Sequence, residues 1–338
     1  MKLNFKVVPK ILVIRFSSIG DIVLTTPVFR CIKKQIPTAE LHFITKLSYK
    51  IVTAGNPYID KFFYLDHDLS LLINELKKEN YDYIVDLHNN VRSLKIKRAL
   101  KKKSFSINKL NVEKFLLTNL NINIMPDAHI TQRSLDTAAP LGVTDDGLGL
   151  EYFIPEKDIV KQADIPTSHA AGFIAIVIGA TYETKKLPVH KLQKLCYKID
   201  HPVMLLGGKE DFSAAEMITS VDPVKIYNAC GKFNLNESAD LLRKSKLVIS
   251  HDTGLMHIAA ALQKPIISIW GNTAPVLGMY PYYGSRSTQQ YDAIEVKGLS
   301  CRPCSKIGYH ACPLEHFKCM ENQDIDGLLQ LIHQKLGK

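Results

Sequence analysis

Short apolar runs alternate along the chain with stretches of helical periodicity. Each run is followed by glycine or small polar residues, and then by a segment whose apolar positions recur with helical spacing. This order is typical of parallel sheets whose strands are joined by helices. In the first part of the chain it predicts strands at 11–16, 41–45 and 83–87, and a helix from about Ile22 to Lys34.

A second set of strands follows after a break. The predicted strands are Phe173–Ile178, Val203–Leu206, Leu247–Ser250 and Pro265–Trp270. The stretch 145–167 contains two glycines and two prolines and has little helical periodicity, which is typical of a linker between domains. We therefore expect two Rossmann-like domains, 1–155 and 168–325. We expect a C-terminal helix at 326–338 to pack back on the N-terminal domain.

The composition indicates an ordinary globular protein. Of the 338 residues, 46% are hydrophobic and 22% are charged. The apolar runs are shorter than the roughly 18 residues that a membrane span needs. Arg15 interrupts the N-terminal run Ile11–Ile14, so we expect no signal peptide and a cytoplasmic protein.

The formal net charge of +10 favours anionic partners. Six basic residues crowd into nine positions: Lys95, Lys97, Arg98, Lys101, Lys102 and Lys103. This run is either a solvated helix end or a docking patch for a phosphorylated or lipid-bound partner. A nucleic-acid-binding protein is disfavoured because aromatic residues do not interleave with the run as a stacking platform requires.

Four of the seven cysteines lie in one loop-like stretch, with the spacing C-x2-C-x7-C-x6-C: Cys301, Cys304, Cys312 and Cys319. In a reducing compartment this spacing indicates a metal knuckle or a reducible redox loop rather than a disulfide framework. The other three, Cys31, Cys196 and Cys230, fall in predicted core elements and are expected to be buried.

The first predicted strand ends in a small-residue turn, Ser17–Asp21, that opens a helix. Asp21 is either a negative charge favoured by the helix dipole or a general base at a strand carboxyl end. The turn is not a G-x-G-x-x-G motif and has no acidic ribose partner at the usual spacing, which disfavours a dehydrogenase.

The strand Leu247–Ser250 leads into a second turn, Asp252-Thr253-Gly254, and then into a helix. The first amides of that helix could hold a pyrophosphate, and Gly254 lets the backbone approach it closely. His257 lies one helical turn after Thr253, so both could face the same ligand. The alternative is that Thr253 caps the helix and His257 is a buried, hydrogen-bonded histidine.

Two further turns carry polar side chains at strand ends. Residues 179–188 combine hydroxyls with Lys185 and Lys186, which suits phosphate oxygens, and Glu210 after Gly207-Gly208 could hold ribose hydroxyls. Taken alone, each is equally an ordinary turn.

Taken together, residues 16–27 and 252–257 resemble the ADP-heptose:lipopolysaccharide heptosyltransferases, glycosyltransferase family 9. Residues 259–265 and 271–275 fit the same pattern, so the resemblance covers about residues 10–325. It implies an α/β protein of GT-B fold, with two Rossmann-like parallel-sheet domains facing an interdomain cleft. The N-terminal domain would bind the acceptor, and the C-terminal domain would bind the nucleotide sugar.

The resemblance also implies roles for individual residues. Asp21 would be the catalytic base of a single in-line displacement with inversion. The implied donor-binding residues are Thr181, Lys185, Lys186, Glu210, Asp252, Thr253, Gly254 and His257. The expected acceptor-binding residues are Ser18, Gly20, His88, Asn89 and Arg92. Two lysines stand where the family commonly has one, so the choice between Lys185 and Lys186 stays open.

The implied function is heptosyl transfer from ADP-heptose to a lipopolysaccharide inner-core acceptor by a metal-independent enzyme. Expected partners are the nucleotide sugar and an acidic lipid-linked saccharide at the inner membrane surface, with no nucleic acid. No cofactor is expected to be required, although the cysteine loop could bind a structural zinc. The alternatives are a family member with another nucleotide sugar or surface-glycan acceptor, or a nucleotide-sugar-binding protein without catalysis. The oligomeric state stays open.

Overall fold

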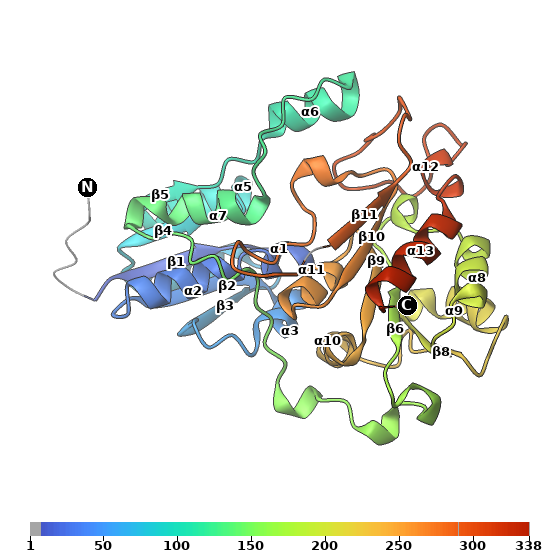
Figure 1. Ribbon diagram of the computed structural model, residues 1–338. Helices are drawn as coiled ribbons and strands as arrows, with labels where there is room; N and C mark the ends of the chain where they lie inside the picture. Colours follow the sequence, from blue (N-terminus) through green and yellow to red (C-terminus); the bar gives the residue numbers. More distant parts are fainter. Residues whose placement is uncertain (1–7, 290, 338) are drawn as a thin grey trace. The chain divides into compact units, whose positions relative to one another are not determined.

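The computed structural model describes residues 8–289 and 291–337 (Figure 1). The described chain forms two compact units. Unit 1 contains the chain up to Lys109, together with Ala128–Phe153 and Gly284–Ser287; unit 2 contains Leu110–Asp127, Ile154–Tyr283 and the chain from Thr288 onwards. The main division falls next to the boundary expected from sequence, but 110–127 and 284–287 belong to the unit opposite to the one expected.

Unit 1 is built on a five-stranded parallel sheet with the order β3-β2-β1-β4-β5. Its strands are β1 (Lys10–Ile14), β2 (Glu40–Lys46), β3 (Lys61–Leu65), β4 (Tyr83–Asp86) and β5 (Lys103–Ser106). Its helices are α1 (Ile19–Val23), α2 (Thr26–Gln35), α3 (Lys50–Thr53), α4 (Leu69–Lys77), α5 (Val91–Leu100) and α7 (Ile130–Ala138), with 3-10 turns at Leu47–Tyr49 and Ala139–Leu141.

Both faces of this sheet are buried, because successive strand side chains point to opposite faces. Ile11 and Val13 pack with Val28 and Phe29 of α2 in one core. Leu12 and Ile14 belong to a second core, which also contains Leu72 and Leu76 of α4 and Ile96 of α5. The near-continuous apolar run of β1 follows from this double burial.

The single helix predicted over 22–34 is wrong, because the chain breaks into α1 and α2 at Leu24–Thr25. The hydroxyls of Thr25 and Thr26 donate to the carbonyls of Ile22 and Val23. Pro27 has no N–H to give to the carbonyl of Val23, so a continuous helix would lose a backbone hydrogen bond there.

Unit 2 is built on a six-stranded parallel sheet with the order β11-β10-β9-β6-β7-β8. Its strands are β6 (Ile174–Val177), β7 (Val203–Leu206), β8 (Ile226–Asn228), β9 (Leu247–His251), β10 (Ile266–Trp270) and β11 (Tyr291–Glu295). Its helices are α6 (Asn111–Leu120), α8 (Val189–Lys198), α9 (Phe212–Thr219), α10 (Leu235–Lys244), α11 (Gly254–Ala261), α12 (Lys318–Glu321) and α13 (Ile325–Lys335). The 3-10 turns are Glu156–Asp158, Gln162–Asp164, Thr167–His169, Glu183–Lys185, Lys209–Asp211 and Pro275–Leu277.

The C-terminal helix α13 belongs to unit 2, and its expected packing back on the N-terminal domain stays a prediction. Leu328 and Ile332 are buried in the same core as Leu192 and Leu195 of α8. Because these two α13 residues are one helical turn apart, the helix presents one apolar stripe, and unit 2 already covers it.

Each sheet changes direction of winding at one point. β1 lies between β2 and β4 in unit 1, and β6 lies between β7 and β9 in unit 2. Ligands of open parallel sheets bind beyond the strand carboxyl ends at such switch points. We therefore expect ligands to bind at the turns after β1 and β4 in unit 1 and after β6 and β9 in unit 2.

Candidate functional site

Asp21 is held at the carboxyl end of β1 by contacts to both of its oxygens. Its Oδ1 lies 2.6 Å from Nη2 of Arg15. Its Oδ2 accepts from the backbone N–H of Ser18 at 3.0 Å and from the Ser18 hydroxyl at 2.8 Å. The carboxylate is thus fixed in the first turn of α1, while 21% of its side chain stays exposed.

The electrostatics of this contact keep Asp21 ionised. Burial alone would raise the pKa of Asp21, but the Arg15 guanidinium and the Ser18 donors hold it below its ordinary value. A carboxylate with a lowered pKa is a weak base that accepts a proton late in a reaction, once the attacking oxygen has become acidic. The two readings of Asp21 are compatible, since the residue both anchors the helix start and carries a partly exposed charge.

The turn after β4 is organised around the buried carboxylate of Asp86. It accepts from the backbone N–H groups of His88 and Asn89 and forms an ion pair with Lys97 at 2.8 Å. Arg15 connects the two turns, because its Nη1 donates to the carbonyl of Leu87 at 2.6 Å. The turns that carry Asp21 and His88 are therefore tied together within unit 1.

His88 is a neutral imidazole beside this pair. Its ring packs edge-to-face on Phe16, with the ring centroids 5.2 Å apart. Burial, and then the positive charges of Arg15 and Lys109, lower the pKa of His88 to about 4. Of the other expected acceptor residues, Gly20 is buried in α1, whereas Asn89 and Arg92 are exposed. Their roles toward an acceptor stay predictions.

In unit 2, Lys185 and Asp252 meet between the ends of β6 and β9. The Lys185 ammonium lies 2.7 Å from Oδ2 of Asp252 and donates to the Asp252 carbonyl at 3.2 Å. The hydroxyl of Thr273, which follows β10, donates to the same Oδ2 at 3.0 Å. A cation, a carboxylate and a hydroxyl from three strand ends are thus gathered at one point.

Lys186 has different partners. Its ammonium lies 2.8 Å from Glu183 Oε1 and 3.1 Å from Oδ1 of the buried Asp211. The other oxygen of Asp211 accepts from the Gly208 N–H at 2.9 Å. Lys186 therefore ties the 181–187 loop to the turn after β7, whereas Lys185 points to the Asp252 turn.

Helix α11 begins without a side-chain cap. Thr253 is its N-cap residue, but the Thr253 hydroxyl lies 3.3 Å from the Ser250 hydroxyl rather than on a helix amide. The first N–H groups of α11, beginning at Gly254, are left for a ligand or water. His257 is buried within this helix.

His251, at the end of β9, supports the loop that carries both lysines. Its Nε2 accepts from the Leu187 N–H at 2.9 Å. Burial, and then the charge of Lys186, lower the pKa of His251 to about 3. The expected donor residues Thr181 and Glu210 are exposed in their turns, and their contacts with a donor stay predictions.

The cysteine loop packs against the Lys185 loop. The Thr184 hydroxyl accepts from the Tyr309 N–H at 2.8 Å and donates to the Tyr309 carbonyl at 3.0 Å. Arg302 donates to the carbonyls of Gly271 and Thr273. Gly308 is required at this contact, because a Cβ there would lie 2.5 Å from the Cβ of Tyr182.

All four loop cysteines line one cavity of about 30 Å³ and carry free thiols. His316 lines the same cavity, with its Nε2 3.7 Å from the Cys301 sulfur. Within residues 8–289 and 291–337, the groups of three or more candidate ligands with atoms within 4.8 Å of one another lie elsewhere. The donor set suits zinc or iron, but the loop does not hold its sulfurs at ligating spacing.

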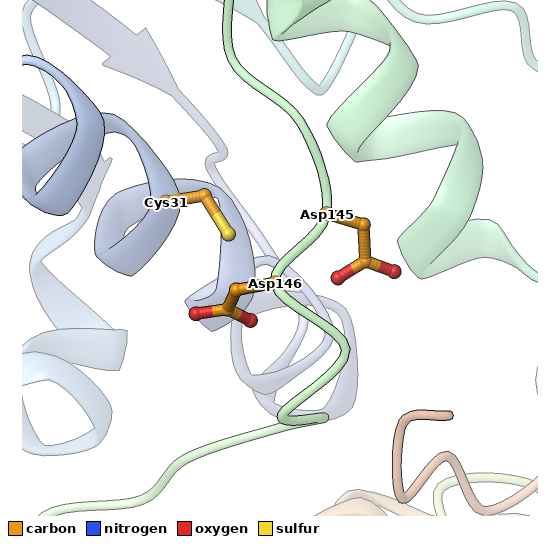
Figure 2. Close-up of side chains that lie close together, drawn as sticks. All are labelled: Cys31, Asp145 and Asp146. Carbon is orange, nitrogen blue, oxygen red and sulfur yellow. The ribbon is translucent and has the colours of Figure 1, made fainter. Parts of the chain in front are cut away.

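One of those other groups is Cys31, Asp145 and Asp146, where α2 meets the chain after α7 (Figure 2). Both Asp146 oxygens already bind the fully buried guanidinium of Arg30, at 2.8 and 2.7 Å. Burial also raises the pKa of the Cys31 thiol to about 11. Arg30 supplies the positive charge there, so the group joins two segments of unit 1 rather than holding a metal.

The second group is Glu40, His42 and Glu79. Glu79 lies between the ammonium groups of Lys61 and Lys10, and the hydrogen bond from Lys61 contributes most to lowering its pKa to about 2. This group too is balanced by its own cations.

Sequence reasoning missed four residues that shape the site: Arg15, Asp211, Thr273 and Arg302. Arg15 precedes the Ser17–Asp21 turn, and Asp211 follows Glu210, so their proximity to the motifs was a signal. Thr273 and Arg302 act on Asp252 and its neighbours from 21 or more positions away, which no local pattern shows.

Known proteins give the same assignment. The family model described as glycosyltransferase family 9 (heptosyltransferase) matches residues 70–308. Lipopolysaccharide heptosyltransferase 1 of Campylobacter coli is 27% identical over 297 residues, which cover 78% of this chain and 84% of the relative. The chain therefore belongs to glycosyltransferase family 9, and the family resemblance seen in the sequence is confirmed.

Solved structures agree on the fold. The structure of Escherichia coli heptosyltransferase WaaC with ADP has a TM-score of 0.69 and 18% identity, covering 96% of this chain and 99% of that one. The iron-containing dodecameric glycosyltransferase TibC from enterotoxigenic E. coli has a TM-score of 0.58 and 14% identity, covering 99% and 78%. The predicted GT-B fold of two Rossmann-like parallel-sheet domains is confirmed. The cleft expected between the domains stays a prediction.

Proposed function

We propose that this glycosyltransferase moves a heptosyl residue from ADP-heptose to a sugar hydroxyl of a lipopolysaccharide inner-core acceptor, with inversion. The observation that carries the proposal is the ionised, partly exposed Asp21, held by Arg15 at the end of β1 in a family 9 chain. The relative named lipopolysaccharide heptosyltransferase 1 and the likeness to a heptosyltransferase with bound ADP support this donor and acceptor class.

In this reaction the acceptor hydroxyl hydrogen-bonds to Asp21 and attacks the anomeric carbon of the donor. The bond from that carbon to the acceptor oxygen forms as its bond to the phosphate oxygen breaks, and the acceptor proton passes to Asp21. ADP leaves with an additional negative charge, which needs stabilisation. Lys185 and the free amides of α11 supply positive charge and hydrogen-bond donors for it.

We propose that this stabilisation needs no divalent cation, because Lys185 and the α11 amides offer the positive field that a metal supplies in other transferases. Full transfer activity after EDTA treatment and gel filtration is the expected result. Activity that returns only on addition of magnesium would contradict the metal-free mechanism.

A metal in the cysteine loop is a separate matter. We propose that the loop draws its sulfurs together around a structural rather than a catalytic zinc, since the four cysteines line one cavity but are not at ligating spacing without the metal. The TibC structure is described as iron-containing, so zinc and iron are both to be measured. Elemental analysis of protein purified without chelator should find about one metal per chain, and loss of that metal should lower Tm.

The direct test is a binding panel of ADP, ADP-heptose, UDP-glucose and GDP-mannose, followed by transfer to a Kdo-lipid acceptor. Selective binding of ADP and ADP-heptose is expected. Preference for a uridine or guanosine nucleotide would replace the donor and keep the fold and the inverting mechanism. Binding without transfer to any acceptor would favour a non-catalytic nucleotide-sugar-binding protein.

The variant Asp21→Asn tests the base. Its turnover should fall by about 10²- to 10⁴-fold, the range for a lost general base, because the amide cannot accept the acceptor proton. ADP affinity should stay within a few-fold, since Asp21 lies in unit 1. Turnover close to that of the wild type would remove Asp21 from the role.

A further inference from the structure

Helix α5 exposes a face that combines positive charge with apolar side chains. Arg92, Lys95, Arg98, Lys101 and Lys102 are exposed on α5 and at its end. Val91 is 69% exposed and Leu94 is 40% exposed on the same helix. Ser93 and Ile96 form its buried side, so the apolar residues Val91 and Leu94 do not serve the core of unit 1.

The stretch of chain that contains α5 has no acidic residue. Residues 87–112 include eight lysines and arginines and no aspartate or glutamate. Lys97 is the exception among the basic residues, because it turns inward to Asp86 and Ser106. The neighbouring helix α4 carries one glutamate, Glu75, and ends with Lys77 followed by Lys78. The exposed α5 face therefore has an uncompensated positive charge.

Basic side chains around exposed apolar ones are the pattern of helices that lie in the interface of an anionic bilayer. The lysines and arginines attract the lipid phosphates, and the apolar side chains enter the headgroup boundary. In the described residues no helix is long and apolar enough to cross a membrane.

We propose that the α5 face, defined as Val91, Leu94, Lys95, Arg98, Lys101 and Lys102, docks the protein on an anionic lipid bilayer. The biological purpose of docking rests on the proposed function, because a lipid-linked acceptor is presented at a membrane. The physical proposal does not, since anionic lipid is bound whether or not transfer occurs.

The test is co-sedimentation of the full chain with vesicles of phosphatidylcholine, with and without phosphatidylglycerol, in the absence of donor and acceptor. The wild type should bind only the vesicles with phosphatidylglycerol, and binding should weaken as salt rises. Changing Lys95, Arg98, Lys101 and Lys102 together to Gln should weaken it by about 10²- to 10³-fold, given about fivefold per charge.

The matched control changes the same amount of charge away from α5 and its neighbour α4: Lys34, Lys157, Lys161 and Lys246, all exposed, to Gln. It should weaken binding by less than tenfold, which separates the α5 face from net charge. Leu94→Asn should weaken binding at high salt more than at low salt, because its contribution is apolar.

The docking proposal fails if the control variant loses as much binding as the α5 variant, or if vesicles without phosphatidylglycerol bind equally well. It also fails if duplex DNA displaces the protein from vesicles and binds it more tightly at the same salt, which would make the face a nucleic-acid surface. ADP affinity, measured on every variant, should be unchanged. Failure of vesicle binding with intact ADP binding and transfer would overturn the docking surface and leave the proposed function standing.

Discussion

Arg15 sets the proton affinity of Asp21. Its guanidinium lies 2.6 Å from the carboxylate, and burial raises the Asp21 pKa when that charge is absent. Arg15→Met should therefore raise the Asp21 pKa and move the acidic limb of the kcat/KM profile to higher pH. Arg15→Lys keeps the charge and should shift the limb less. A pH–rate profile that is the same in all three proteins would show that Asp21 does not govern that limb.

Alanine substitutions of Lys185 and Lys186 should affect different properties, ADP affinity for Lys185 and thermal stability for Lys186. Lys185→Ala removes the cation beside Asp252 and the α11 amides, so ADP affinity should fall by about 10- to 100-fold, as for a charge-assisted hydrogen bond. Lys186→Ala leaves the buried Asp211 with fewer partners, so Tm should fall while ADP affinity changes by a few-fold. Calorimetry with ADP and thermal unfolding measure both. The reverse order of affinity losses would assign the phosphate to Lys186.

At this scale the sequence located the chemical groups but not their partners. Asp21, Lys185 and Asp252 stood out because each follows a strand in a recognisable turn. The choice between the two lysines needed the structure, since adjacent residues point to different turns, one to Asp252 and the other to Asp211. Residues that act across the fold, such as Thr273, leave no periodic or local signal.

The element that connects the cysteine loop to the donor loop is a short contact between Thr184 and Tyr309. It consists of two hydrogen bonds of the Thr184 hydroxyl and one from the Thr184 N–H. Thr184→Val removes the hydroxyl at nearly constant volume and should loosen the loop that carries Lys185. ADP affinity should fall by about 5- to 150-fold, at about 0.5–1.5 kcal/mol for each of the two hydroxyl hydrogen bonds.

Thr184→Ser is the matched control, because it keeps the hydroxyl and should bind ADP nearly as well as the wild type. Isothermal titration of the two variants decides the matter. Equal affinity in Thr184→Val and the wild type would mean that the cysteine loop does not position Lys185.

Central strands could be predicted, and edge strands could not. β1, β6, β9 and β10 are buried on both faces and read as continuous apolar runs. β5 is Lys-Ser-Phe-Ser, and β11 is only partly buried, so neither has such a run. Those edge strands form because a parallel neighbour offers its backbone groups, which is a property of the assembled sheet rather than of the segment.

For the whole molecule, the sequence indicated two units but not to which unit each short segment belongs. The stretch 110–127 and α13 both follow recognisable elements, and an apolar helical stripe does not say which core it covers. The buried ion pairs of Arg30 with Asp146 and Glu151 join positions more than a hundred residues apart within unit 1. Such pairs are decided by the topology.

Both units should lose stability as the pH falls from about 7 to about 5, because each buries histidines in the neutral form. Burial lowers the pKa of His42 and His88 in unit 1 and of His169 and His251 in unit 2. The unfolded chain protonates these groups near their ordinary pKa of about 6.5, before the folded chain does. Stability therefore falls below that pH by about 1.4 kcal/mol per pH unit for each histidine, down to its folded pKa.

The variant His251→Gln isolates one of these groups. Its side-chain oxygen can still accept from the Leu187 N–H, but it does not titrate. Between about pH 7 and about pH 5 the variant should lose about 2 kcal/mol less than the wild type in urea unfolding of the full chain. His67→Gln is the matched control, because 94% of the His67 side chain is exposed and its neighbour Asp66, at 3.2 Å, is exposed as well. A His251→Gln protein that loses as much stability as the wild type would mean that the folded chain protonates His251 at about the same pH as the unfolded chain does, so that the fold does not favour the neutral imidazole.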